Sequence, residues 1–354
     1  MRRKKTKLFS WLFVVLFLGT ALIGGCGQTA SPPSNGSAEA PAVELNFATW
    51  QPPAYPNNTQ VYQPFIDEVA EQTDGRVQMY LHPGGVLAKG DETYDAVVTG
   101  MLDMGFSLQS YTPGRFPLTT ILEFPFMFTS SMQACETAAE LYQTNTAFQD
   151  EYGDVKVIWI GTTDTSVLIS SKPVDTVEDF KGLRIRTPGP VQNDMVTALG
   201  ATPVSMPYTE VYDAIQRGIV DATFGPQTSI FPFNFHEVAE HIVYVDFYST
   251  PLFVVMNQSA WDKISPADQE IITEIMDKLP QQMGGLYNMR VEGVQKDLVE
   301  HNLNVITFSD EELQKAKDIL DPLEDKWLSD MEANGVPARE VYEQIKALAE
   351  KYEE

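Results

Sequence analysis

The sequence predicts a two-lobed α/β protein, because a strand-loop-helix-strand unit occurs twice in the chain. Residues 92–106 (ETYDAVVTGMLDMGF) and 210–224 (EVYDAIQRGIVDATF) align without gaps and share seven identical residues. The length of 354 residues and the hydrophobic content of 43% suit about two globular domains, each with its own core. The alternative is that common helix-cap patterns recur by chance, and seven identities in register favour the repeat.

Each repeat predicts an amphipathic helix that ends at a glycine, Gly100 or Gly218, as a left-handed cap requires. Strand-like residues precede the helices, over 76–82 (RVQMYLH) and 201–206 (ATPVSM), and further strands follow them. Open parallel sheets bind ligands outside the carboxyl ends of their strands. Two such lobes therefore predict a ligand cleft between them, which closes by a hinge motion.

The remaining elements follow from periodicity and from helix caps. The pattern predicts strands over 45–50, 155–160 and 183–186, and helices over 60–72, 176–180 and 191–199. A long helix begins after Ser265 and runs toward Asn302, with a weak point at Gly284-Gly285. Residues 309–312 form a capping box that opens another helix, and the acidic C-terminal stretch is expected to be a solvated helix.

The N-terminal segment is predicted to address and tether the protein, and not to fold with it. Residues 1–25 combine a basic start with an apolar run, which is typical of a secretory signal peptide. The ending Leu22-Ile23-Gly24-Gly25-Cys26 resembles a bacterial lipobox and implies cleavage before Cys26 and lipidation of this residue. The alternative is an uncleaved membrane anchor, and in both cases the folded part lies outside the cytoplasmic membrane. Residues 26–43, rich in Pro, Ser, Gly and Ala, predict the lipidated cysteine and a flexible tether.

Charge and cysteine content exclude several classes of protein. The net charge is −25, and it becomes −30 when the five cationic residues of the leader are removed. Such an acidic chain is a poor partner for nucleic acid and for anionic head groups, so the lipid and not electrostatics would hold it at the membrane. Two cysteines exclude a disulfide scaffold, and Cys135 is expected to be a small buried thiol.

No residue pattern predicts catalysis, a cofactor or a metal site. The four histidines lack zinc-type spacing, and the sequence contains neither a G-x-S-x-G elbow nor a phosphate-binding glycine loop. A lipoprotein hydrolase, one rival class, would need a nucleophile–base pair that the sequence does not supply. We therefore expect a binding protein and not an enzyme.

Arg186 stands out by its position as a candidate for a charged binding group. It ends the strand 183–186, opposite the apolar Leu183/Ile185 face and just before Pro188-Gly189-Pro190. A guanidinium binds a carboxylate through two parallel hydrogen bonds. The alternative is an arginine that pairs with an acidic surface neighbour, and spacing alone favours that alternative.

Four segments resemble the substrate-binding proteins of TRAP (tripartite ATP-independent periplasmic) transporters. They are KGLRIRTPGPVQNDMVTALGATPVSMPYTEVYDAIQRGIVDA at 181–222, LHPGGVLAKGDETYDAVVTGMLD at 81–103, FPF at 124–126 and VVMNQSAWDKISPADQE at 254–270. The resemblance covers nearly the whole chain after the leader. It implies a periplasmic-binding-protein-like fold, with a ligand cleft between two α/β lobes and a long helix that spans both. It also implies that Arg186 binds a ligand carboxylate, which reverses the preference for a surface pair.

The resemblance also implies how the chain is divided and what it does. Residues 44–163 with 251–290 would form lobe I, and residues 164–250 with 291–354 would form lobe II. The implied function is that of an extracytoplasmic receptor, which captures a small organic acid and passes it to a membrane permease powered by an ion gradient. We expect a monomer that binds no nucleic acid. The rival interpretation is the same fold serving an ABC importer or a sensor kinase.

The chain departs from the family pattern at three places. Ser166 stands where the sialic-acid branch has a second arginine, Gly225 replaces a motif asparagine, and Thr223-Phe224 replace the Glu-Trp pair of metal-chelating branches. These departures favour a monoanion with aromatic or branched bulk over a dicarboxylate, because a second buried charge would lack a partner. The other predicted site residues are Trp50, Gln51, Tyr208, Phe224 and Gln227. For the aromatic residues among them, core packing is the alternative.

Overall fold

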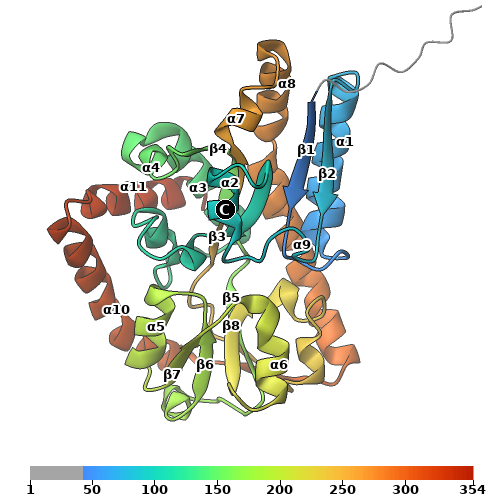
Figure 1. Cartoon of the computed structure of the whole chain (residues 1–354). Coiled ribbons are helices and arrows are strands. Elements are labelled where there is room, and N and C mark those ends of the chain that lie inside the picture. Colours follow the sequence, from blue (N-terminus) through green and yellow to red (C-terminus); the bar gives the residue numbers. More distant parts are fainter. Residues whose placement is uncertain (1–42, 354) are drawn as a thin grey trace, which may run out of the picture. The chain divides into compact units, whose positions relative to one another are not determined.

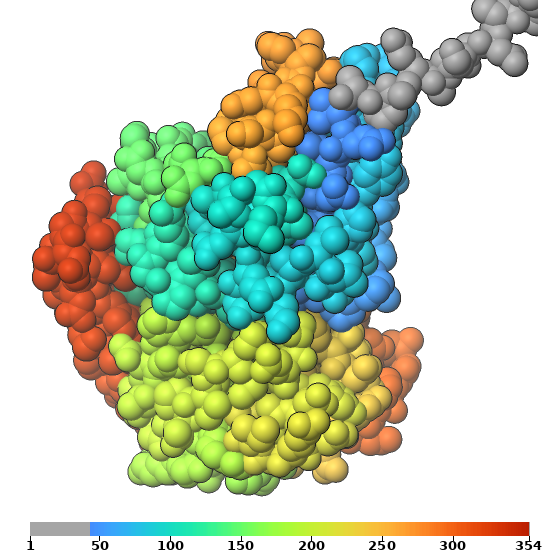
Figure 2. Space-filling view, in the orientation of Figure 1, coloured from blue at the N-terminus to red at the C-terminus, as the bar shows by residue number. Residues whose placement is uncertain are grey.

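The computed structural model describes residues 43–353, which contain two β-sheets with helices packed around them (Figure 1). The predicted signal peptide, Cys26 and the tether up to residue 42 lie outside the described residues. Val43, predicted as the last tether residue, instead begins a strand. We call the part built on the five-stranded sheet the first lobe and the part built on the six-stranded sheet the second lobe. In the view of Figure 2 the two lobes meet along a narrow seam.

The two sheets have related strand orders. The order in the first lobe is β2-β1-β3-β10-β4, and in the second lobe it is β11-β9-β5-β8-β6-β7. The strands of the first lobe are β1 (Val43–Ala48), β2 (Val77–His82), β3 (Met104–Leu108), β4 (Val155–Thr162) and β10 (Pro251–Asn257). The strands of the second lobe are β5 (Ser166–Ser170), β6 (Arg184–Thr187), β7 (Thr202–Ser205), β8 (Ala222–Pro226), β9 (His241–Tyr244) and β11 (Asn304–Thr307).

Helices connect and cover these strands. The α-helices are α1 (Gln63–Gln72), α2 (Thr93–Val98), α3 (Ser131–Thr144), α4 (Thr146–Asp150), α5 (Pro190–Ala198), α6 (Val211–Gln216), α7 (Gln258–Trp261), α8 (Pro266–Met276), α9 (Leu279–Glu300), α10 (Asp310–Ala333) and α11 (Ala338–Lys351). A π-helical turn, η1 (Asn58–Tyr62), precedes α1. The 3₁₀ turns are η2 (Gln109–Tyr111), η3 (Thr119–Glu123), η4 (Val177–Phe180), η5 (Tyr208–Glu210), η6 (Gln227–Ser229) and η7 (Phe235–Glu237).

The predicted repeat forms the centre of each lobe. The unit β1-α1-β2-α2-β3 builds three parallel strands in the order β2-β1-β3, and β6-α5-β7-α6-β8 builds the same arrangement as β7-β6-β8. The glycines after α2 and α6, Gly100 and Gly218, have φ angles of 75° and 65°, as left-handed caps require. The repeat therefore produces the same topology in both lobes.

The chain crosses between the lobes from β4 to β5 and again from β9 to β10. In the first lobe β10 runs antiparallel to β3 and β4, and in the second lobe β5 runs antiparallel to β8 and β9. An antiparallel strand from the other half of the sequence thus lies beside the last strand of each repeat. These crossings bring the carboxyl ends of the repeat strands from both lobes to one region.

The long helix predicted from Ser265 toward Asn302 is in fact two helices, α8 and α9. The interruption falls at Asp277 and Lys278, two residues before Pro280 in the first turn of α9. Proline lacks the N–H that would continue the ladder of α8, and it is well tolerated at the start of the next helix. The prediction of a weak point at Gly284-Gly285 is therefore wrong.

Gly284 and Gly285 lie inside α9, where they serve helix packing. A Cβ atom on Gly284 would lie 2.9 Å from the Cα of Met132 in α3, whereas one on Gly285 would lie 3.7 Å from the nearest atom of Met132. The first glycine thus lets the backbones of α3 and α9 approach closely. Helix α9 also contacts η6 of the second lobe, so it touches elements of both lobes, as predicted.

The C-terminal helices also contact both lobes. Helix α10 contacts α5 in the second lobe, and α11 contacts α3 in the first, where Gln133 donates a 2.9 Å hydrogen bond to the carbonyl of Ala349. The predicted placement of 291–354 in lobe II therefore does not hold for α11; the other lobe limits remain a proposal. α10 is also not simply solvated, because Leu320 and Trp327 on one face are buried. No helix within residues 43–353 has the length and apolarity needed to cross a membrane.

Candidate functional site

The repeat strands of both lobes end at a small interlobe cavity of about 40 Å³. The first lobe contributes Trp50 and Gln51, just after β1, and Phe106 from β3; the second contributes Arg186 from β6 and Phe224 from β8. The full lining is Trp50, Gln51, Tyr55, Phe106, Leu108, Thr163, Arg186, Pro188, Tyr208, Phe224, Gly225, Pro226, Phe233, Tyr248, Thr250, Leu252 and Tyr287. The cavity therefore lies where the topology of open α/β sheets places ligands.

Arg186 is buried in this cavity, with only 2% of its surface exposed. Its Nε donates a 2.8 Å hydrogen bond to the carbonyl of Met206, and its Nη2 donates one of 3.0 Å to the hydroxyl of Tyr111. Its guanidinium lies 5.0 Å from the ring centre of Tyr208, a cation–π contact. Among residues 43–353, no carboxylate lies within 4.0 Å of this guanidinium. A buried positive charge with neutral partners is costly, and an anion would relieve that cost.

Arg184, two residues earlier on the same strand, shows the alternative arrangement. Its side chain is 44% exposed and forms hydrogen bonds of 3.0 and 3.2 Å with the carboxylate of Asp221. The surface pair that sequence spacing favoured for Arg186 is thus formed by Arg184. The contrast marks Arg186 as an arginine whose position is not explained by an internal ion pair.

Aromatic rings form most of the cavity wall. Trp50 lies 5.6 Å from Phe106 and 6.4 Å from Tyr208, and Phe233 lies 5.0 Å from Tyr208, measured between ring centres. Phe106 and Phe224 occupy the same position in the two sequence repeats, so the repeat itself delivers one ring from each lobe. This wall suits the flat or apolar body of a ligand.

Tyr111 joins the two lobes beside Arg186. Its hydroxyl accepts hydrogen bonds from Arg186 and, at 2.7 Å, from the backbone N–H of Tyr208, both in the second lobe. Burial raises the pKa of Tyr111 above the ordinary value, although nearby Arg186 opposes the shift, so the phenol is neutral at physiological pH. The first lobe therefore holds the arginine in place through a neutral group.

Gly225 allows Tyr208 to occupy the cavity wall. A Cβ atom at position 225 would lie only 2.0 Å from the hydroxyl oxygen of Tyr208. The hydroxyl instead forms a 2.7 Å hydrogen bond with that of Ser229. Glycine in place of the family asparagine at position 225 therefore leaves the room that the ring of Tyr208 occupies.

Five of the six predicted binding residues come together at the cavity. Arg186, Trp50, Gln51, Tyr208 and Phe224 all line it, and the Oε1 of Gln51 is buried there without a hydrogen-bond partner among the described residues. The sixth, Gln227, lies outside the lining; its Oε1 accepts a 2.9 Å hydrogen bond from Tyr244. The sequence analysis missed Phe106, although its position in the repeat matches that of Phe224. It also missed Tyr111 and Phe233, because no motif or periodicity around these residues indicates a binding role.

The positions of the other departures are consistent with this site. Ser166 and Thr223 are fully buried in β5 and β8, outside the cavity lining. Among residues 43–353, no cluster of three or more His, Cys, Asp or Glu side chains could hold a metal ion. Cys135 is buried, as expected, and burial raises the pKa of its thiol to about 12.

The two α/β lobes and the buried interlobe arginine define a two-lobed solute receptor. Residues 47–330 match the family described as bacterial extracellular solute-binding protein, family 7 (DctP), and the chain belongs to this family. The family consists of solute-binding receptors outside the cytoplasmic membrane. The predictions of a TRAP-type receptor and of a two-lobed α/β fold are confirmed.

Several relatives match over most of their length. A TRAP solute-binding protein from Rhodoferax ferrireducens, solved with copurified benzoate, is 25% identical, with a TM-score of 0.82 over 87% of this chain and 98% of that one. A TRAP periplasmic solute-binding protein from Bordetella bronchiseptica, with bound (R)- and (S)-mandelate, is 26% identical, with a TM-score of 0.81 over 88% and 100%. The sialic acid-binding periplasmic protein SiaP of Vibrio cholerae is 25% identical over 276 residues, 73% of this chain and 80% of that protein.

Proposed function

We propose that this receptor binds an aromatic or branched monocarboxylate, with the carboxylate held by Arg186. The observation that carries the proposal is a guanidinium that is 2% exposed and has only neutral hydrogen-bond partners among residues 43–353. The relatives that bind benzoate and mandelate, both aromatic monocarboxylates, support this ligand class. We propose Trp50, Gln51, Tyr208 and Phe224 as further binding residues, and we withdraw Gln227.

The lining of the cavity favours one negative charge over two. Arg186 is the only cationic side chain among the lining residues, so the second carboxylate of a dicarboxylate would be buried without a partner. The rest of the wall is largely aromatic and apolar, which matches a ring or a branched body. No metal ligand cluster supports a metal-bridged acid within the described residues.

Binding requires the lobes to open. A volume of about 40 Å³ holds only about three water molecules, far less than a benzoate-sized ligand needs. Tyr111 bridges the lobes at the cavity edge, so its two hydrogen bonds would break on opening and form again around the ligand. We infer a hinge motion at the β4–β5 and β9–β10 connections.

A competition series of matched monocarboxylates and dicarboxylates without added metal tests this ligand class. We expect benzoate, mandelate and a branched aliphatic acid to displace one another, and succinate and malate to compete weakly. Tight binding of succinate or malate with no binding of aromatic monoacids would contradict the proposal. In that case a second cation must neutralise the second carboxylate. Arg290 is the first candidate to test, because it lies close enough to affect the pKa of Tyr55 in the cavity wall.

We also propose that the mature protein is a monomeric lipoprotein, anchored through Cys26, that delivers its ligand to the membrane subunits of a TRAP transporter and has no enzymatic activity of its own. The proposal rests on the apolar run that ends in Gly24-Gly25-Cys26 and on the family. Cys26→Ser should prevent lipidation and release the protein from the membrane fraction. A variant that stays firmly in the membrane would support an uncleaved anchor instead.

A further inference from the structure

The two lobes also meet where η2 and η3 of the first lobe pack against the start of α5 in the second. Gly189 precedes α5, and a Cβ atom on it would lie 2.9 Å from the Cβ of Ser110 and 3.0 Å from its carbonyl oxygen. The missing side chain therefore lets the lobes approach closely. Nearby, the Nε2 of Gln192 in α5 donates a 2.6 Å hydrogen bond to the carboxyl group of Glu123 in η3. We call Ser110, Glu123, Gly189 and Gln192 the α5 seam.

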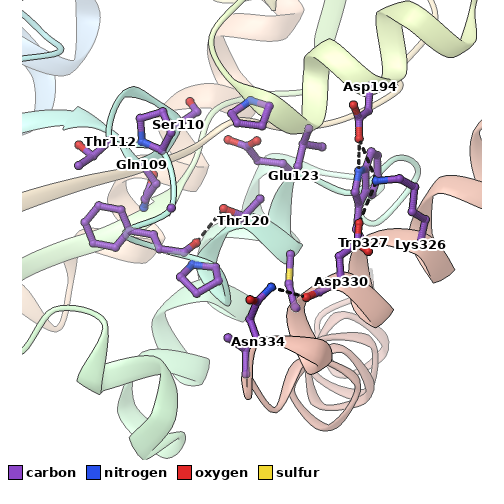
Figure 3. Close-up of a pocket in the computed structure, with 18 residues that line it drawn as sticks. Gln109, Ser110, Thr112, Thr120, Glu123, Asp194, Lys326, Trp327, Asp330 and Asn334 are labelled. Carbon is purple, nitrogen blue, oxygen red and sulfur yellow. Dashed lines mark hydrogen bonds and ion pairs between the residues drawn. The ribbon is translucent and has the colours of Figure 1, made fainter.

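Glu123 is buried in this seam among neutral groups. It is 2% exposed, and its side-chain partners are the amide of Gln192 and the hydroxyl of Ser110. Figure 3 shows Glu123 and Ser110 on one wall of a pocket, with Lys326 on the other, where it pairs with two aspartates. A buried carboxylate without a cation is costly, and a protonated carboxyl group in the same place avoids that cost.

The proton affinity of Glu123 depends on whether the seam is closed. Burial raises its pKa to about 7, although the hydrogen bonds from Gln192 and Ser110 lower it. Opening of the lobes takes Gln192 away and brings water to the carboxyl group, so the pKa returns toward the ordinary value of 4.5. Protonation therefore favours closure fully below pH 4.5, and this contribution is lost as the pH rises through about 7.

Tyr248 connects the seam to the carboxylate site. This residue lines the Arg186 cavity, and burial raises the pKa of its phenol; the charge of Glu123 raises it further, and Arg186 lowers it. Glu123 and Arg186 thus both act on one group in the cavity wall. An ionised Glu123 would oppose a ligand anion at Arg186, and its protonation removes that repulsion.

The other titratable groups of the elements packed around Glu123 are tyrosines or members of ion pairs. The tyrosines stay neutral because burial raises their pKa values, and the acids pair with Lys326 across the pocket. These groups are Tyr111 on η2, Asp194 on α5, Tyr248 before β10, Lys326 and Asp330 on α10, and Tyr342 on α11. Glu123 is therefore the group at the seam whose charge closure changes.

We propose that the α5 seam couples ligand capture to the uptake of one proton, which Glu123 takes from solvent as the lobes close. The proton stays on the carboxyl group while the seam is closed and returns to solvent when the lobes open. The proposal rests on the carboxylate function proposed for Arg186 and adds the regulation of that site. Glu123 acts through closure and not by contact with the ligand, so it is a positioning residue.

Calorimetric titration with benzoate in buffers of different ionisation enthalpy counts the protons taken up on binding. Benzoate is an anion throughout the range used, so the uptake belongs to the protein. We expect roughly 0.5–1 proton per benzoate at about pH 6, almost none at about pH 8.5, and an affinity ~10-fold weaker at the higher pH. No binding of benzoate at any pH would overturn this proposal and the proposed function together. Binding without proton uptake at the lower pH would overturn this proposal alone.

Three variants assign the proton to Glu123. Glu123→Gln keeps the shape of the side chain but takes up no proton, so the uptake should disappear and the affinity should become nearly independent of pH. Glu151→Gln is the matched control: burial also raises the pKa of Glu151 to about 7, but its partners Leu118 and Thr119 belong to the same lobe, so proton uptake should equal that of the wild type.

Gln192→Leu keeps the test valid if Glu123→Gln folds poorly. It removes the donor that favours ionised Glu123, so the fall in benzoate affinity should move to a higher pH, which a merely structural role of Gln192 would not cause. Undiminished proton uptake in Glu123→Gln, or an unshifted pH profile in Gln192→Leu, would overturn the assignment.

Discussion

Substitution of Gly225 by alanine should disrupt the cavity through a single atom. The new Cβ would lie 2.0 Å from the hydroxyl oxygen of Tyr208, 2.9 Å from its Cζ and 3.1 Å from its Cε2. Gly225 has no positive φ angle, so alanine is compatible with the backbone and the effect arises from this contact. Tyr208 must therefore swing away from β8 and from Arg186.

The destabilisation has two parts, the steric overlap and a lost hydrogen bond. Overpacking of a buried site costs about 1–3 kcal/mol, and loss of the buried hydrogen bond between Tyr208 and Ser229 costs about 1 kcal/mol more. We expect Gly225→Ala to lower the free energy of unfolding by about 2–4 kcal/mol. Loss of the ring from the face of Arg186 should weaken carboxylate binding by ~3- to 30-fold.

A double-mutant cycle isolates this contact. Urea unfolding is measured for the wild type, Gly225→Ala, Tyr208→Phe and the double variant. Phenylalanine lacks the hydroxyl oxygen, which is the closest atom, so Gly225→Ala should cost at least about 1 kcal/mol less in the Tyr208→Phe background than in the wild type. Carboxylate titration of the same four proteins gives the effect on the site. An equal cost of Gly225→Ala in both backgrounds would show that contact with the Tyr208 hydroxyl does not cause the destabilisation.

Three further predictions concern the site, the pH dependence and the helix packing. Arg186→Ala should weaken carboxylate binding tens-fold or more, and Arg186→Lys should also lose affinity because the planar fork is gone; unchanged dissociation constants in calorimetry would remove Arg186 from the site. Burial raises the pKa of Glu123 from 4.5 to about 7, so the folded state favours the protonated side chain. The stability that this protonation contributes is fully present below pH 4.5 and is lost as the pH rises through about 7. Across that window the unfolding free energy of the wild type should fall by about 3 kcal/mol relative to Glu123→Gln, and parallel pH profiles would contradict this. In α9, Gly284→Ala should destabilise by about 1–2 kcal/mol through contact with Met132, whereas Gly285→Ala should stabilise by about 0.5–1 kcal/mol; thermal unfolding with the same sign for both would argue against close packing.

The sequence was informative wherever a local pattern determines the structure. The two repeats predicted the parallel units of both lobes, because helix caps and alternating strands are properties of short segments. The end of such a strand in turn marked Arg186 as a candidate. Its residue type and spacing could not show whether Arg186 binds a ligand or pairs with a surface acid, because that depends on whether an acid lies nearby in space. The family resemblance favoured the ligand-binding role. Arg184 and Arg186 look alike in sequence, and only the position of Asp221 separates them.

The parts that sequence reasoning missed depend on contacts between distant segments. The importance of Tyr111 lies in hydrogen bonds to residues 75 and 97 positions away. Gln227 begins a turn just after β8, and this turn directs its side chain to Tyr244 and away from the cavity. Gly284 resembles a flexible point by residue type, yet it is required by the neighbouring α3. The placement of α11 on the first lobe likewise follows from its contacts with α3.

Calorimetric titration of the wild-type protein with benzoate and with benzamide tests whether Arg186 recognises a carboxylate. The two compounds have the same ring and similar shape, but only benzoate offers a charge to Arg186. If the buried arginine recognises a carboxylate, benzoate should bind at least ~30-fold more tightly than benzamide, and Arg186→Gln should remove most of the difference. Equal affinities of the wild type for the two compounds would contradict the assignment of Arg186 as the carboxylate-binding group.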